Sequence, residues 1–260
     1  MTIGFIGTGN MGGALMAAMG PHYRLCACSR GRERLERACA AAGAKALDRP
    51  EDVAAEADLV ILAVKPAVVP SVLARLQGVW RQEAILVSVA VGLPLSLYEE
   101  ALGSGRKLVR AMPNTPAAVG EGVTALCFGS GCTEEDRAMV RKAFSCCGLA
   151  EELPESLMGG VSALTGSSPA YLCMLLEAMA DAGVYQGIPR TQAIRMAAQA
   201  MLGTAKLVLE SGKHPAQLKD EVCSPGGTTI RGVAALEQRG FRAAILDAIN
   251  LCADASRGKQ

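Results

Sequence analysis

The sequence predicts an α/β fold: a Rossmann-type, doubly wound parallel sheet followed by an all-helical second domain. In about the first 150 of its 260 residues, short β-type runs alternate with helical patterns. A glycine-rich segment lies between the first strand-like run and the first helical pattern. Beyond residue 154 the strand-like runs disappear and apolar residues recur at three- and four-residue spacing. We therefore expect two domains, residues 1–154 and 155–260.

The expected strands of the first domain are short and mostly apolar. Leu59–Val64 is an unbroken apolar run, which is typical of a parallel sheet covered by helices on both faces. The other expected strands are Ile3–Ile6, Arg24–Cys28, Ile85–Val89, Leu108–Met112 and Val123–Phe128. Helices are expected at Asn10–Met19 and Arg32–Ala42, because each helical pattern is followed directly by glycine.

The second domain is expected to consist of long helices rich in Ala, Leu and Met. They are predicted at Pro169–Gln186, Thr191–Glu210, Ile230–Gln238 and Phe241–Arg257. About 100 residues give poor cover to helices this uniformly apolar, and a helix that is apolar all round must be buried somewhere. We therefore expect this domain to pack against its counterpart in a second subunit, giving at least a homodimer.

Composition excludes several classes of partner. The net charge is +1 and aromatic residues make up 3% of the chain, which argues against a nucleic-acid partner. No run approaches the roughly 18–20 apolar residues of a spanning helix, so no membrane partner is expected. The ten cysteines are scattered without paired CxxC motifs, and His22 and His214 are isolated. We expect no metal site, and a reducing, cytoplasmic location.

The glycine-rich segment matches the dinucleotide-binding pattern G-x-G-x-x-G. It consists of Gly7, Thr8, Gly9, Asn10, Met11 and Gly12, and it follows a predicted strand and opens a predicted helix. In this pattern the first glycine permits a tight turn, the second lets the backbone approach a pyrophosphate, and the third allows close packing of helix and strand. The N–H groups at the helix N-terminus then point at the phosphates. We expect a nicotinamide dinucleotide here.

Residues after the second strand indicate which dinucleotide is bound. NAD-specific sites usually place an acid there to bind the ribose 2′-hydroxyl. This chain has Ser29 and Arg30 at that position, with no acid before Glu33. Because a guanidinium pairs well with a phosphate, we expect NADPH as the cofactor and NADH as a weaker substitute.

Two further loops follow strands on the edge where such sheets bind ligands. The first is Ala63-Val64-Lys65-Pro66, in which the proline can begin the next helix and leave the lysine exposed. The second is the small-residue run Ser88–Gly92, whose Ala90 is expected to lie beside a flat nicotinamide ring. An ordinary strand-to-helix turn explains either loop almost equally well.

The segment Ser224–Thr229, which reads Ser-Pro-Gly-Gly-Thr-Thr, precedes a predicted helix. Glycine backbone, free N–H groups and hydroxyls at a positive helix end suit an anion-binding turn. The same residues could equally be only a helix cap, since serine and threonine are favoured there. The residues alone leave both interpretations open.

With these motifs in view, the sequence resembles the pyrroline-5-carboxylate reductase family over nearly its whole length. Besides the glycine pattern, the resemblance rests on Val64–Pro66, Arg110–Pro116, Leu164–Tyr171 and Asp220–Ile230. The last two segments are specific to this family, whereas many dehydrogenases share the glycine pattern.

The resemblance implies NADPH-dependent reduction of 1-pyrroline-5-carboxylate to L-proline, the last step of proline biosynthesis. It also implies a helical domain that intertwines in a homodimer, and often a homodecamer built from dimers. It places Asn114 among the cofactor-binding residues and a hydrogen bond to the substrate, the catalytic role, on Thr229. The implied substrate-binding residues are Val222, Cys223, Ser224, Pro225, Gly226, Gly227, Thr228 and Thr229.

Two other functions were weighed. A 3-hydroxyacid dehydrogenase has a similar layout but uses a lysine on a long helix as its acid–base group, and no lysine occurs here between Lys142 and Lys206. A non-catalytic NADP(H) sensor would have no reason to keep the Ser224–Thr229 loop. A cyclic imine near its iminium form is already activated, so positioning supplies much of the rate and neither histidine is needed.

Overall fold

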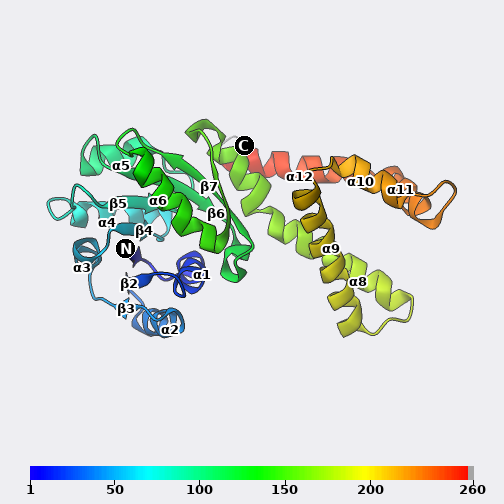
Figure 1. The fold of residues 1–260 in the computed structure, drawn as a ribbon, viewed down its shortest axis with the longest axis horizontal. Helices are drawn as coiled ribbons and strands as arrows, with labels where there is room; N and C mark the ends of the chain where they lie inside the picture. The colour runs from blue at the N-terminus through cyan, green and yellow to red at the C-terminus, as the bar shows by residue number, and fades with distance from the viewer. Residues whose placement is uncertain (257–260) are drawn as a thin grey trace. The chain divides into compact units, whose positions relative to one another are not determined.

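The computed structural model describes residues 1–256, which form two compact units (Figure 1). The first consists of residues 1–167 together with residues 253–256, and the second of residues 168–252. We call them the nucleotide unit and the helical unit. The expected domain boundary between residues 154 and 155 stays a prediction.

The nucleotide unit is built on one eight-stranded sheet (Figure 1). The strands are β1 Thr2–Ile6, β2 Arg24–Cys28, β3 Lys45–Ala46, β4 Leu59–Leu62, β5 Ile85–Ser88, β6 Leu108–Pro113, β7 Gly122–Phe128 and β8 Gly148–Glu152. Their order across the sheet is β3-β2-β1-β4-β5-β6-β7-β8. The chain thus starts in the middle of the sheet and winds first to one edge and then to the other, which confirms the doubly wound fold.

The last two strands depart from the expected all-parallel sheet. Strands β1 to β6 are parallel, but β7 pairs antiparallel with β6, and β8 runs parallel to β7. Only residues 114–121 connect β6 to β7, and a parallel crossover needs a dozen residues or more. The short connection therefore forces the chain to turn back.

Helices cover both faces of this sheet (Figure 1). They are α1 Asn10–Met19, α2 Arg32–Ala42, α3 Pro50–Glu56, α4 Val69–Leu76, α5 Leu95–Leu102 and α6 Glu134–Phe144, with the short α7 Met158–Val161 after β8. One buried apolar cluster contains Phe5 and Leu15, and a second, separate cluster contains Leu62 and Leu73. Two cores on opposite faces explain why strands such as β4 are apolar at every position.

The helical unit contains α8 Ser168–Tyr185, α9 Arg190–Ser211, α10 Pro215–Val222, α11 Thr228–Gln238 and most of α12 Phe241–Ser256. Helices α8, α9, α11 and α12 agree with the expected helices to within two residues at each end, except that Arg257, the expected end of the last one, lies outside the described residues. The short α10 was not among the expected helices. Gly183 of α8 lies against Ala193 of α9, where a side chain would be crowded. Small residues thus allow these two helices to approach closely.

Few side chains of the helical unit are shielded from solvent. Among its described hydrophobic residues, only Ala180, Ala193, Ala197 and Leu218 are buried. Large apolar side chains stand exposed instead, including Leu209 at 77% and Leu251 at 71% of their area. Taken as a single copy, this unit therefore has almost no core of its own.

Candidate functional site

The glycine-rich loop connects β1 to α1. Gly7 has a left-handed backbone with φ of 103°, which favours glycine, and an added Cβ there would collide with the carbonyl group of Ala63. A Cβ on Gly12 would collide with the carbonyl oxygen of Gly7. Both glycines are therefore fixed by the tight packing of the loop against α1 and the end of β4.

The middle of the same loop is open. A Cβ added to Gly9 would meet nothing within 4 Å, although this residue caps α1 in an ordinary extended conformation. No side chain caps this helix, so the N–H groups of its first turn, at Asn10, Met11 and Gly12, keep their donors available. The Thr8 hydroxyl is buried without a hydrogen-bond partner in the described structure.

The predicted cofactor loops lie along one edge of the sheet. The Gly7 N–H donates to the Cys28 carbonyl at 2.8 Å, and the Ala63 N–H donates to the Ile6 carbonyl at 2.9 Å. The Val89 N–H donates in turn to the Leu62 carbonyl at 3.1 Å. These bonds bring the carboxyl ends of β2, β1, β4 and β5 into a row.

Ser29 is half-buried and Arg30 is exposed at the end of β2. Arg30 has no hydrogen-bond or ion-pair partner within residues 1–256. The two cysteines of β2 lie just behind them, and burial raises the pKa of Cys26 to about 11 and that of Cys28 to about 12. Both thiols are neutral at physiological pH, so neither offsets the free positive charge of Arg30.

Beyond β4, Ala63 and Val64 are half-buried and Lys65 is exposed. Pro66 opens the 3₁₀ turn Pro66–Val68, with Lys65 in extended backbone just before it. The expected conformation of this loop, in which the proline starts a helical turn and leaves the lysine exposed, is confirmed.

A cavity of about 160 Å³ opens beside the β5 loop. Ala90, Gly92, Met112 and Arg110 contribute to its lining. Arg110 NH1 donates to Glu155 Oε1 at 2.6 Å, and the same carboxylate oxygen accepts the Leu95 N–H at 2.8 Å. Sequence analysis did not assign this ion pair, although an arginine inside an apolar strand was the available signal.

Asn114 follows β6 and is 8% exposed. Its side-chain oxygen accepts the Val123 N–H at 2.9 Å, and its side-chain nitrogen donates to the Thr165 carbonyl at 3.1 Å. Both ends of the amide are thus engaged with backbone, so this side chain holds the β6–β7 connection in place.

The predicted substrate loop lies in the helical unit, between α10, which ends at Val222, and α11. Gly226 has a left-handed backbone with φ of 69°, and Gly227 is the N-cap of α11. No side chain caps α11, and Thr228 and Thr229 lie exposed in its first turn. The hydroxyls of the Ser224–Thr229 segment therefore do not cap α11, which was one of the two interpretations that the sequence allowed.

The isolated histidine before α10 has a structural role. His214 is the N-cap of α10, and its Nδ1 accepts the Ala216 N–H at 3.2 Å. Such a cap satisfies a donor that the helix itself cannot.

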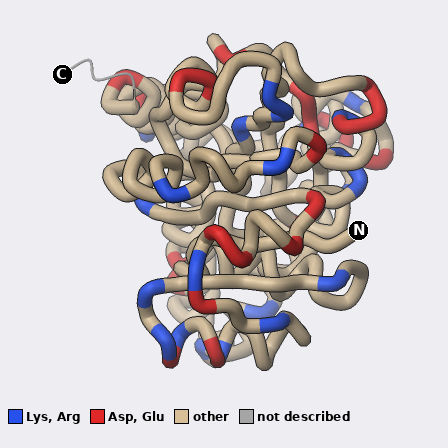
Figure 2. Tube along the Cα trace, turned by 90° about the vertical axis from the view of Figure 1, so that its left-hand side faces the viewer, with Lys and Arg blue, Asp and Glu red and all other residues tan. Residues whose placement is uncertain are grey.

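Acidic and basic residues are intermixed along the chain (Figure 2). Among residues 1–256, no helix is both long and apolar enough to cross a membrane. The same part of the chain contains no group of three or more side chains arranged to hold a metal ion.

Known proteins that resemble this chain in sequence include several pyrroline-5-carboxylate reductases. Residues 155–259 match the family "Pyrroline-5-carboxylate reductase dimerisation", and residues 2–92 match "NADP oxidoreductase coenzyme F420-dependent". The chain is 42% identical to the pyrroline-5-carboxylate reductase of Escherichia coli (strain K12), over 98% of this chain and 96% of that one. It is 40% identical to the Arabidopsis thaliana enzyme, over 98% and 94%.

Solved structures of pyrroline carboxylate reductases also resemble this chain over nearly its full length. A crystal structure of Plasmodium falciparum pyrroline carboxylate reductase with NADP bound superimposes with a TM-score of 0.88 at 30% identity, covering 100% of this chain and 98% of that one. Identity above 40% across almost the full length of both chains is more than a shared fold. The chain belongs to the pyrroline-5-carboxylate reductase family.

Proposed function

We propose that this protein is an NADPH-dependent pyrroline-5-carboxylate reductase. It reduces the C=N bond of 1-pyrroline-5-carboxylate and gives L-proline, the last step of proline biosynthesis. The observation that carries the proposal is the match to known reductases at 42% identity over 98% of the chain, which includes both units. The geometry of the glycine loop and of the α11 N-terminus supports it.

The residues of the glycine loop fit a dinucleotide. Open space over Gly9 allows a pyrophosphate to approach the backbone, and the uncapped first turn of α1, at Asn10, Met11 and Gly12, offers N–H donors. A buried hydroxyl without a partner is costly, and a phosphate oxygen at this loop supplies the acceptor that Thr8 lacks. When bound, NADPH supplies the hydride for the imine carbon.

The remaining predicted cofactor residues lie at or after the carboxyl ends of the neighbouring parallel strands. Ser29 and Arg30 bind the 2′-phosphate, for which NADH has no counterpart, so NADH is the weaker cofactor. Ala63, Val64, Lys65 and Pro66, with Ala90 on the neighbouring loop, border the cofactor. Asn114 acts by holding the β6–β7 connection, since its amide is already engaged.

In the helical unit, the loop from Val222 to Thr229 binds the substrate. Its members are Val222, Cys223, Ser224, Pro225, Gly226, Gly227, Thr228 and Thr229. The uncapped N-terminus of the 11-residue helix α11 attracts the substrate carboxylate through free N–H groups and the positive end of the helix dipole. The Thr229 hydroxyl accepts a hydrogen bond from the protonated ring nitrogen, directly or through water.

The protein needs to supply little acid–base catalysis for the reduction. The imine nitrogen carries its proton as an iminium, so the ring carbon is electrophilic before it reacts. The loop residues then contribute orientation, and orientation alone is worth up to about 7–11 kcal/mol of the barrier. Thr229 keeps the nitrogen aligned while its positive charge is lost.

The same family match supports the assembly and location that we propose. Residues 155–260 form the dimerisation domain after a boundary at 154, and dimers assemble further into a decamer. Exposed apolar side chains throughout the helical unit support the dimer. Neutral, buried thiols such as Cys28 and Cys147 suit the cytoplasm, where thiols stay reduced.

The function is tested by following NADPH oxidation with 1-pyrroline-5-carboxylate and, separately, with a 3-oxo acid. Turnover with the imine alone, together with L-proline as the product, is the expected result. Turnover with the 3-oxo acid instead would indicate a hydroxyacid dehydrogenase. Tight NADPH binding without turnover of any cyclic imine acid would indicate a sensor.

A further inference from the structure

An acidic residue, Asp48, follows β3, the strand that pairs with β2 and thus lies next to Ser29. β2 and β3 are parallel, with Cys26 opposite Lys45 and Ala27 opposite Ala46. The ladder continues past β3, because the Leu47 N–H donates to the Ala27 carbonyl at 2.8 Å. Asp48 follows one residue after Leu47, and by extension of this register it corresponds to Ser29 on β2, a strand spacing of about 4.8 Å away.

Asp48 is in contact with an arginine that follows β2. Arg32 NH1 lies 2.8 Å from Asp48 Oδ1, and Arg32 Nε lies 2.6 Å from Glu36 Oε1. Two carboxylates thus share a single guanidinium. All three side chains are more than half exposed, so each can reorganise when a ligand arrives.

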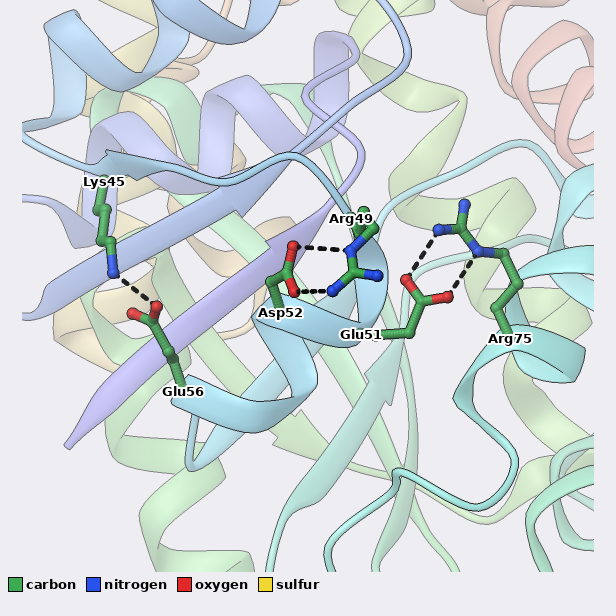
Figure 3. Close-up of polar contacts among 6 residues, drawn as sticks. All are labelled: Lys45, Arg49, Glu51, Asp52, Glu56 and Arg75. Atoms are coloured by element: carbon green, nitrogen blue, oxygen red, sulfur yellow. Dashed lines mark hydrogen bonds and ion pairs between the residues drawn. The ribbon is translucent and has the colours of Figure 1, made fainter.

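The neighbouring acids on α3 have cations of their own. Figure 3 shows Glu51 paired with Arg75, Asp52 with Arg49 and Glu56 with Lys45. Unlike these three acids, Asp48 is paired with an arginine that follows β2.

The two arginines nearest Ser29 differ in their surroundings. Arg32 lies between the carboxylates of Asp48 and Glu36, whereas Arg30 has no ion-pair partner within residues 1–256. A 2′-phosphate bound beside Ser29 would meet the free guanidinium of Arg30 and, at Arg32, a guanidinium that is already neutralised by two carboxylates. An acid near the ribose also disfavours a phosphate directly by charge repulsion.

We propose that Asp48 is a specificity-determining residue that limits the preference of this protein for NADPH over NADH. It acts by holding Arg32 away from the 2′-phosphate and by its own charge. The inference rests on the proposed NADP(H) site and concerns how strongly that site discriminates.

The test is the binding of NADP⁺ and NAD⁺ to the full-length protein, measured by isothermal titration calorimetry. In Asp48→Asn we expect the Kd for NADP⁺ to fall about three- to tenfold, as one exposed charge within a few ångströms allows, while the Kd for NAD⁺ stays unchanged. The gain shrinks at high salt, because both groups are exposed. Arg32→Gln added to Asp48→Asn removes the part of the gain that comes from the freed Arg32 and leaves the smaller part that comes from the lost charge of Asp48.

A matched control is Glu56→Gln, which also removes one carboxylate from an exposed ion pair but at Lys45, away from the strand end. It should leave both dissociation constants unchanged. An unchanged ratio of the two constants in Asp48→Asn would overturn the inference, as would weaker NADP⁺ binding, which would mean that Asp48 instead positions Arg32 for the phosphate. If the unmodified protein bound neither nucleotide, the proposed function itself would fail, and the inference with it.

Discussion

The nucleotide unit and the helical unit bury their apolar residues in opposite ways. In the nucleotide unit, large side chains such as Phe5, Leu15 and Leu73 are at most 1% exposed. In the helical unit, the buried hydrophobic residues are three alanines and one leucine, while Leu209 is 77% exposed. The first unit has a core of its own, whereas the second exposes large apolar side chains, as expected of a domain that matches a dimerisation family.

This difference separates what each unit can do alone. Every predicted cofactor residue lies in the unit that has its own core, so cofactor binding needs only a correctly folded chain. The predicted substrate loop lies in the unit that lacks one. Substitutions in the subunit interface should therefore lower substrate turnover while the nucleotide unit stays folded.

The largest effect is expected when charges are placed on the exposed apolar face of α9, because this face is expected to lie in the dimer interface. Leu202 and Leu209 are two helical turns apart and lie on the same side of the helix. Burying two carboxylates in an interface costs several kcal/mol, so Leu202→Asp with Leu209→Asp should weaken the dimer about a thousandfold. Analytical ultracentrifugation measures this change.

The matched control lies in the nucleotide unit. Val119 is 76% exposed, nearly the same as Leu209, and Val119→Asp should leave the oligomeric state unchanged. Equal dissociation in both variants would show that exposure alone does not mark the interface.

Within the nucleotide unit, two glycines separate the effect of a substitution on cofactor binding from its effect on stability. A methyl group fits at Gly9, so Gly9→Ala should keep the unfolding temperature but weaken NADP⁺ binding about a hundredfold by blocking the pyrophosphate. Gly12→Ala should instead lower the stability by about 1–3 kcal/mol, because its Cβ meets the Gly7 carbonyl oxygen. Calorimetric titration and thermal unfolding distinguish the two. Unimpaired NADP⁺ binding by Gly9→Ala would contradict the site.

Thr229 tests the helical unit in the same manner. Thr229→Ala removes one hydrogen bond to a charged ring nitrogen, worth about 1.5–3 kcal/mol, so kcat/KM should fall about 10- to 100-fold. NADP⁺ affinity should not change, and Thr229→Ser should recover most of the activity. Full kcat/KM in Thr229→Ala would refute the assignment.

The smallest expected effect concerns the α6 capping box. The Asp136 carboxylate accepts from Lys107 and from the Thr133 N–H and hydroxyl. Burial alone would raise the pKa of Asp136, but the Lys107 and Thr133 hydrogen bonds hold that pKa below its usual value. This stabilisation is therefore complete above the unfolded pKa of about 3.9 and is lost as pH falls through the lower folded value.

Asp136→Asn should accordingly cost about 1–2 kcal/mol of unfolding free energy near neutral pH and progressively less in acid. Urea unfolding at several pH values measures the difference. A cost that stayed constant down to the acid limb would mean that the charge of Asp136 is not what stabilises the cap.

Sequence patterns predicted most of the fold because they were local. The bounds of Asn10–Met19 and Arg32–Ala42 are confirmed to the residue, since a glycine follows each helix directly. Two strands were missed. Lys45–Ala46 is too short to show a pattern, and Gly148–Glu152 lies at the sheet edge, where none of its residues is buried and no apolar run marks it.

Features that depend on distant parts of the chain could not be predicted in the same way. The pairing of Asp48 with Arg32 requires the register of β2 and β3, and β3 itself was missed. The engagement of the Asn114 amide by Val123 and Thr165 depends on the close return of β7. The antiparallel direction of β7, in contrast, was already implied by the short connection that precedes it.

The most direct test of the contrast between the two units is sedimentation equilibrium of the unmodified protein at micromolar concentration. A mass of at least twice 26.9 kDa is the expected result, because a second copy must cover the helical unit. A stable, active monomer of 26.9 kDa would contradict it, since the exposed apolar helices would then face water without consequence.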